Sequence, residues 1–254
     1  MRGRIAILSL FICLSTTVFL LSGCATRGSG DIVSRTFYSD DFTAINITGH
    51  FFVTYRHAND AKVVVYMQES LLNRLSVTIS NGKLSIDTDN IRRIPEIRPR
   101  IYVYAPYLSE VFLYGANIGW GWDIVTTQNF TFIAHATVES LHMGALNFVI
   151  PLKVESLTTA INAHSIRHNE IVSAGQLTLY GYAVEAVIET IGYVVVDAIN
   201  LQTDNARILA EEGLVSIAAA ETLEVYRVTS LAEVRYTGNP VVTLLDEFQA
   251  IQSE

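Results

Sequence analysis

Cysteine is almost absent from this chain of 254 residues, which has only Cys13 and Cys24. Cys13 lies inside an apolar N-terminal run, and no cysteine follows Cys24. The residues after Cys24 therefore cannot form a disulfide among themselves. Small exported domains often depend on disulfides, so we expect this one to be stabilised by hydrophobic burial and backbone pairing alone.

Basic residues are also scarce, with 17 Lys and Arg against 25 Asp and Glu and a net charge of −8. Nucleic-acid binding needs a basic patch that contacts phosphates, and we therefore expect no nucleic-acid partner. The one basic cluster holds Arg92, Arg93, Arg98 and Arg100 and is interrupted by two prolines. We interpret this cluster as a solvated loop, with the binding of an anionic ligand as the less favoured alternative.

A second long apolar run is missing, and no transmembrane helix is predicted. The run from Ile5 to Leu21 is short and contains Ser and Thr, and Arg2 and Arg4 precede it, as in a signal peptide. Ser22-Gly23-Cys24 at its end resembles the lipobox of bacterial lipoproteins. The resemblance implies cleavage between Gly23 and Cys24, a diacylglycerol on the Cys24 thiol and an acyl chain such as palmitate on its amine.

The lipobox also predicts the location and organisation of the chain, because two or more acyl chains anchor a protein stably to a membrane. Ala25 replaces the aspartate that retains lipoproteins in the inner membrane of enteric species, which indicates the outer membrane of a diderm bacterium. The side of that membrane that the domain faces is left open. The predicted parts are a signal peptide (1–23), a lipidated cysteine with a flexible tether (24–35), a folded domain (36–242) and a C-terminal cap (243–254).

Beyond the tether the pattern is β almost throughout. Apolar and polar residues alternate in 45–48, 77–79 and 84–86. Asn81-Gly82 separates the last two segments, which is a strong hairpin signal. Only residues 68–75 predict a helical turn, with leucines on one side.

A five-residue template, apolar-x-apolar-x-small, recurs in the second half of the chain. Its copies begin at Val111, Thr131, Leu152, Leu177, Val194, Val215 and Val234, and an upstream copy begins at Ile45. The spacing of the copies is near 20 residues, which is typical of a solenoid whose stacked coils share one core. We therefore predict an all-β, right-handed parallel β-helix, or β-solenoid, with equivalent template positions on neighbouring coils. A β-sandwich is the alternative.

The C-terminal tail has a helical pattern. Leu244, Leu245, Phe248 and Ile251 share one face of a helix over Thr243–Ile251. We predict a short amphipathic helix that closes the C-terminal end of the solenoid, because an uncovered strand edge promotes aggregation.

Three segments resemble the head GIN domain family, also called putative auto-transporter adhesins: residues 42–53, 75–86 and 232–240. The Ser-Gly-Ala turn of the family repeats has changed to forms such as Tyr114-Gly115-Ala116. The resemblance implies a β-solenoid fold in an envelope protein, often a lipoprotein. It brings no established catalytic residues.

No arrangement of residues typical of catalysis or metal binding is found in the sequence. Glycosidic cleavage needs two carboxylates across a cleft. Glu155 and Asp197 share a template position, but Tyr180 occupies this position on the copy between them. His164 and His168 have metal-ligand spacing, and residues 87–90 offer calcium-type oxygens, yet both are interpreted as solvated turns. We predict no catalytic residues, no metal and no cofactor.

Both tryptophans of the chain, Trp120 and Trp122, lie within three residues of one another. Aromatic side chains on a loop can stack on sugars or anchor a partner, and they can equally fill the core. We take the pair as the candidate ligand-binding residues. The predicted protein is a lipid-anchored, non-catalytic binding, adhesion or structural module, with a glycan or an envelope protein as its partner. A carbohydrate-active β-helix enzyme, a polysaccharide lyase or hydrolase, is the alternative.

Overall fold

The computed structural model describes residues 30–39, 41–87, 98–115, 118–119, 121–135, 146–163 and 175–246. The predicted signal peptide, the tether up to residue 29 and the lipidation residues Gly23 and Cys24 lie outside this part, as do Trp120 and the tail beyond Asp246. No helix in the described part is both long and apolar enough to cross a membrane.

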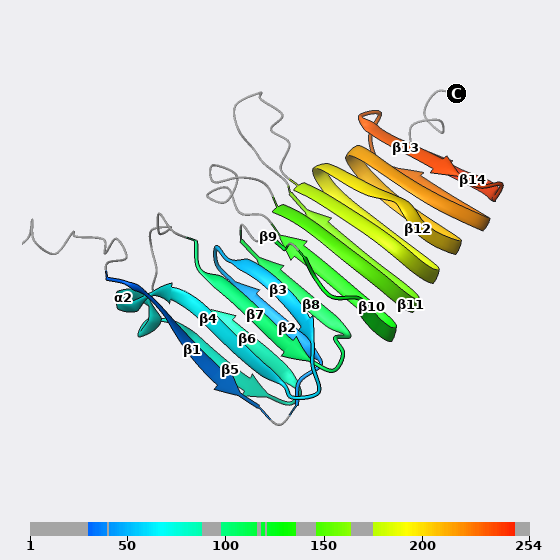
Figure 1. Cartoon of the computed structure of the whole chain (residues 1–254). Helices are drawn as coiled ribbons and strands as arrows, with labels where there is room; N and C mark the ends of the chain where they lie inside the picture. The colour runs from blue at the N-terminus through cyan, green and yellow to red at the C-terminus, as the bar shows by residue number, and fades with distance from the viewer. Residues whose placement is uncertain are drawn as a thin grey trace, which may run out of the picture.

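Almost all of the described chain forms strands of one sheet (Figure 1). The strands of the first half are β1 (Ile32–Tyr38), β2 (Ala44–Thr48), β3 (Phe52–His57), β4 (Lys62–Gln68), β5 (Ser76–Ser80), β6 (Lys83–Asp87), β7 (Arg100–Ala105), β8 (Glu110–Tyr114) and β9 (Ile118–Gly119). The later strands are β10 (Val125–His135), β11 (Leu146–Asn162), β12 (Gly175–Arg227), β13 (Ala232–Thr237) and β14 (Val241–Asp246). The helix is α2 (Glu69–Leu72).

The sheet is mixed. The hydrogen-bonded order is β1-β4-β7-β3-β9-β11-β10-β8-β2-β6-β5, and β12 pairs with β11, β13 and β14. β1 and β4, β4 and β7, and β5 and β6 pair antiparallel. The prediction of a right-handed parallel β-helix is therefore wrong. The later strands pair parallel, as a β-helix requires, whereas β4 runs antiparallel to β1 and β7, and β5 runs antiparallel to β6.

Two local predictions are confirmed. β5 and β6 form a hairpin in which Asn81 (φ 52°) and Gly82 (φ 71°) have the left-handed conformations of a type I′ turn. The predicted helical turn is α2, whose Leu71 and Leu72 are buried. Both are decided within a few residues of sequence, which is why local patterns suffice to predict them.

The predicted alignment of the repeats is right at the two ends and wrong between them. Ile45 pairs with Val111, and Val215 pairs with Val234, as the template requires. Leu152, however, pairs with Gly181 rather than Leu177. Paired residues of β10 and β11 are 27 positions apart, and the sequence between these strands includes residues 136–145. Paired residues of β11 and β12 are 29 positions apart, and the sequence between them includes residues 164–174.

β12 consists of several successive passes of the chain whose inward residues build the core. A straight strand of its 53 residues would span about 170 Å, and Figure 1 shows instead that β12 turns repeatedly. The inward residues of its passes, such as Leu179, Val196 and Ile217, are completely buried. The alternation of buried and exposed positions therefore builds a continuous apolar core along the stack.

The predicted C-terminal helix is wrong for the residues that the structure describes. Val241–Asp246 forms β14, which pairs parallel with Thr222–Arg227 of β12. Paired residues of β12 and β14 are 19 positions apart in the chain, and the same offset joins β12 to β13. The hydrogen bonds to β12 therefore decide the structure of this segment against its local helical pattern. Leu244 and Leu245 are exposed on this last strand.

Candidate functional site

Strands β1, β4, β7 and β3 are neighbours in the sheet and expose one face to solvent. In β4 and β7 the inward residues, such as Val63, Val65, Ile101 and Val103, are fully buried. The alternate positions point outward because successive side chains of a strand face opposite sides. On β4 and β7 these outward positions hold aromatic and basic side chains.

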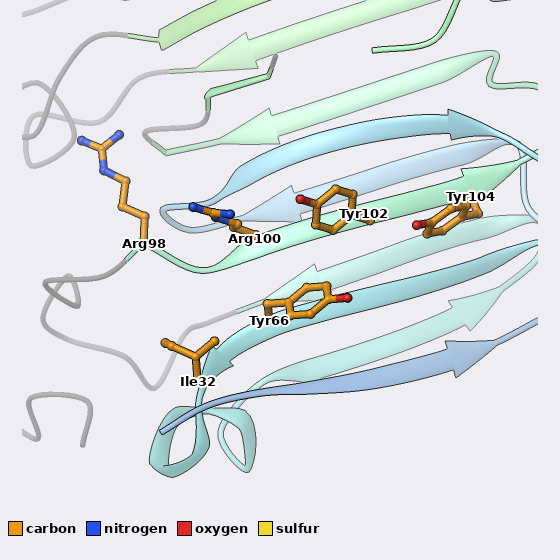
Figure 2. A pocket seen from close by; sticks show the side chains of 6 residues that line it. All are labelled: Ile32, Tyr66, Arg98, Arg100, Tyr102 and Tyr104. Atoms are coloured by element: carbon orange, nitrogen blue, oxygen red, sulfur yellow. The ribbon is translucent and has the colours of Figure 1, made fainter. Parts of the chain in front are cut away.

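Four of these side chains, together with Ile32 of β1 and Arg98 just before β7, line a hollow of about 480 Å³, which we call the tyrosine–arginine hollow. It is lined by Ile32, Tyr66, Arg98, Arg100, Tyr102 and Tyr104. Figure 2 shows Tyr102 and Tyr104 following one another along β7, with Tyr66 beside them on β4 and the two arginines at one end. The hollow is open to solvent, since Tyr66 is 41% and Ile32 46% exposed.

The pairing of β4 with β7 fixes how the rings lie. Tyr66 is opposite Arg100, and Val64 is opposite Tyr102. Tyr66 and Tyr102 are thus diagonal neighbours, and their rings meet edge to face with centroids 5.6 Å apart and planes at 79°. At the next position along β7, the Lys62 ammonium lies 4.9 Å from the centre of the Tyr104 ring. These contacts orient the rings relative to one another.

The charge of this face differs in sign from that of the whole chain. None of β1, β3, β4 and β7 contains an aspartate or a glutamate, although the chain has 25 of them. On the outward face the same strands carry Arg56, Lys62 and Arg100, whereas Arg35 lies opposite the inward Val65. Arg56 forms an ion pair with Asp123 at 3.1 Å. The strands that form the hollow are therefore locally basic.

Two buried polar atoms lack a hydrogen-bond partner at the arginine end. They are Nη1 of Arg98 and Oε1 of Gln68. Gln68 lies opposite Ile32, which lines the hollow, and Arg98 lines the hollow itself. A buried polar group without a partner is rare and destabilising.

Trp122, one of the two candidate ligand-binding residues, lies in the core. It is 4% exposed, and its Nε1 donates a hydrogen bond to the Val53 carbonyl oxygen at 2.9 Å. Its ring meets those of Phe132 and Phe148 edge to face, with centroids 6.4 Å away in both cases. Trp122 thus fills the core. Trp120 lies outside the described residues, and its role in ligand binding stays a prediction.

The remaining sequence candidates are scattered. Arg98 and Arg100 of the basic cluster meet in the hollow, while Arg92 and Arg93 lie outside the described residues. Glu155 is exposed on β11, and the Asp197 carboxylate accepts a hydrogen bond from the Ile199 amide. Within the described ranges, no three His, Cys, Asp or Glu side chains gather into a possible metal site.

The tyrosines of the hollow were missed by sequence reasoning. The signal was present in Tyr102-x-Tyr104 beside the basic cluster, but Tyr66 joins them only through the register of β4 and β7. Two other tyrosines have a raised pKa. Burial, assisted by Asp123, raises the pKa of Tyr55 to about 12, and the charge of Asp204 raises the pKa of Tyr182. Neither lines the hollow.

Fold and hollow together define an all-β protein with an aromatic and basic face. The family model described as "Putative auto-transporter adhesin, head GIN domain" matches residues 41–240. The chain therefore belongs to the head GIN domain family, which confirms the resemblance carried by its three segments. No curated protein matches the chain.

Solved structures share the fold. A putative adhesin from Bacteroides fragilis NCTC 9343 superposes with a TM-score of 0.72 at 16% identity. A putative lipid binding protein and a putative adhesin, both from Parabacteroides distasonis ATCC 8503, superpose with TM-scores of 0.61 at 16% and 15% identity. In each case the match covers 87% of this chain and 95% of the other.

Proposed function

We propose that this protein is a lipid-anchored binding module of the outer membrane of a diderm bacterium, which holds a glycan in the tyrosine–arginine hollow without cleaving it. The observation that supports this function most directly is the open, aromatic and basic lining of the hollow. The strands of the domain extend from Ile32 to Asp246, and in this proposal Cys24 carries the lipid.

The aromatic lining suits a sugar. Tyrosine combines a large apolar ring with a hydroxyl that stays in water, so it can cover the C–H face of a sugar ring and bond its hydroxyl groups. Tyr66, Tyr102 and Tyr104 present such surfaces on two adjacent strands. Their fixed contacts lower the entropy that is lost when a ligand orders the site.

Binding without cleavage agrees with the residues of the hollow. Glycosidic cleavage by the common route uses a pair of carboxylates, and the six lining side chains include no carboxylate. Adhesin and lipid-binding names among the structural relatives also refer to binding. The alternative, a carbohydrate-active enzyme, would have to use another site.

The test is an array of glycans and envelope polymers, probed with the full-length protein in detergent and read for both retention and cleavage products. We expect retention of at least one glycan with no product. Cleavage would contradict the proposal in favour of the enzyme. Absence of retention on every glycan would also contradict it and would direct the search to envelope proteins by cross-linking.

A further inference from the structure

We infer that the hollow selects acidic sugars, and that Arg98 and Arg100 bind the sugar carboxylate while the tyrosines cover the ring. This inference rests on the proposed function and adds the chemical class of the ligand. Glycans that bear a uronic acid or another carboxylated sugar are the expected ligands.

The first argument is the distribution of charge. The chain is acidic overall, so an acidic polymer is repelled by most of its surface. The three strands that contribute to its lining, β1, β4 and β7, are free of Asp and Glu. An acidic ligand is therefore attracted to this face and disfavoured elsewhere, which gives the site both orientation and specificity.

The second argument is the state of the two arginines. Arg100 is exposed and lies opposite Tyr66. Arg98 has its guanidinium carbon 5.7 Å from the centre of the Phe52 ring, and its Nη1 is buried without a partner. A guanidinium group matches a carboxylate through two parallel hydrogen bonds. A carboxylate at this end of the hollow would supply the acceptor that Arg98 lacks.

The experiment compares polygalacturonate with the same polymer after chemical reduction of its carboxyl groups, with binding to the full-length protein in detergent measured by calorimetry at physiological salt. We expect the acidic polymer to bind about tenfold tighter or more. Arg100→Gln and Arg98→Gln should each remove most of this preference. Arg207→Gln, at an exposed arginine of β12 that lies 3.8 Å from Glu224, is the matched control and should keep it.

Each other outcome overturns the inference. Equal binding of both polymers would reject carboxylate selection and leave the proposed glycan binding intact. No binding of either polymer, together with no retention on the glycan array, would contradict the carboxylate selection and the glycan binding alike. Dextran sulfate bound as tightly as polygalacturonate would show that charge alone acts. Anionic phosphatidylglycerol vesicles bound in place of the polymer would point to a lipid headgroup. Arg98 is partly buried, so its variant can fail to fold, and Arg100→Gln is then the deciding variant. If Arg100→Gln keeps the preference for polygalacturonate over the reduced polymer, the assignment of Arg100 to the sugar carboxylate is overturned.

Discussion

Tyr66 of β4 and Tyr102 of β7 meet edge to face across the sheet, with ring centroids 5.6 Å apart and planes at 79°. The two residues are 36 positions apart in the chain and become diagonal neighbours only through the antiparallel register of their strands. Their contact forms the aromatic part of the hollow, and it gives the proposed function its most direct test.

Tyr66→Ala is expected to weaken glycan binding by about tenfold or more, because it removes an aromatic anchor and the ring that supports Tyr102. Stability should change little, since Tyr66 is 41% exposed. Affinity is measured by calorimetry with a glycan retained on the array, and folding by circular dichroism.

Tyr180→Ala is the matched control, because Tyr180 of β12 is likewise 41% exposed and lies outside the hollow. We expect its affinity to equal that of the unmodified protein. Similar losses in both variants, or none in Tyr66→Ala, would remove the hollow as the binding site.

Trp122→Ala is expected to lower the free energy of unfolding by about 3–5 kcal/mol, because it leaves a large cavity next to Phe132 and Phe148 and removes the hydrogen bond to Val53. Urea denaturation measures the loss. The single variant Trp120→Ala, compared in a binding assay, then tests the ligand role predicted for that residue. A Trp122→Ala protein as stable as the original would contradict the placement of this ring in the core.

Alkaline pH should destabilise the fold through Tyr55. Its hydroxyl is buried and donates to the Ala105 carbonyl oxygen at 3.1 Å, and its pKa is raised from 10.0 to about 12. The folded state therefore holds the phenol proton more tightly than the unfolded state. The resulting stability is complete below pH 10 and is lost as the pH rises through 12.

Tyr55→Phe should reduce this alkaline loss, measured as the free energy of unfolding at several values between pH 9 and about 12. At neutral pH the variant should be about 1 kcal/mol less stable, because one hydrogen bond is gone. The Ala105 oxygen still accepts from the Ala58 amide at 3.1 Å, so it is not left without a partner. Identical pH profiles for the two proteins would refute a role for Tyr55.

Gly213→Ala should destabilise the stack of β12 by about 3 kcal/mol or more. Gly213 has φ +92°, and a Cβ there would lie 2.1 Å from the Val194 carbonyl oxygen, so backbone must move. Gly82→Ala in the β5–β6 turn is the control, because Gly82 has φ +71° but no atom within 4 Å of the added carbon. It should cost only about 1 kcal/mol. Thermal melting compares them, and equal losses would show that the close approach to Val194 has no effect.

Cys24→Ala should release the protein from the membrane fraction, because the proposed acyl chains are attached to this residue. The measurement is an immunoblot of soluble and membrane fractions after cell lysis. Ser22→Ala, which keeps a small residue before the cleavage point, should remain in the membrane. A Cys24→Ala protein that is still found in the membrane pellet would argue against lipid anchoring.

Short-range sequence patterns were reliable where neighbouring residues decide the structure. The Asn81-Gly82 turn and the α2 turn are examples, since the left-handed backbone and the leucine spacing are local properties. The helix predicted over Thr243–Ile251 was wrong for the described residues up to Asp246, because Val241–Asp246 pairs with β12. The basic cluster was visible in the sequence, and its two described members, Arg98 and Arg100, line the hollow.

By itself, the sequence determined an all-β domain without internal disulfides, its hairpin and its family, because these follow from alternation, turn chemistry, cysteine count and motif. The mixed pairing of the sheet, the burial of Trp122 and the meeting of Tyr66 with Tyr102 and Arg100 were decided by tertiary structure. Strand register joins residues that are tens of positions apart, as when Tyr66 lies opposite Arg100, and no local pattern specifies which strands become neighbours.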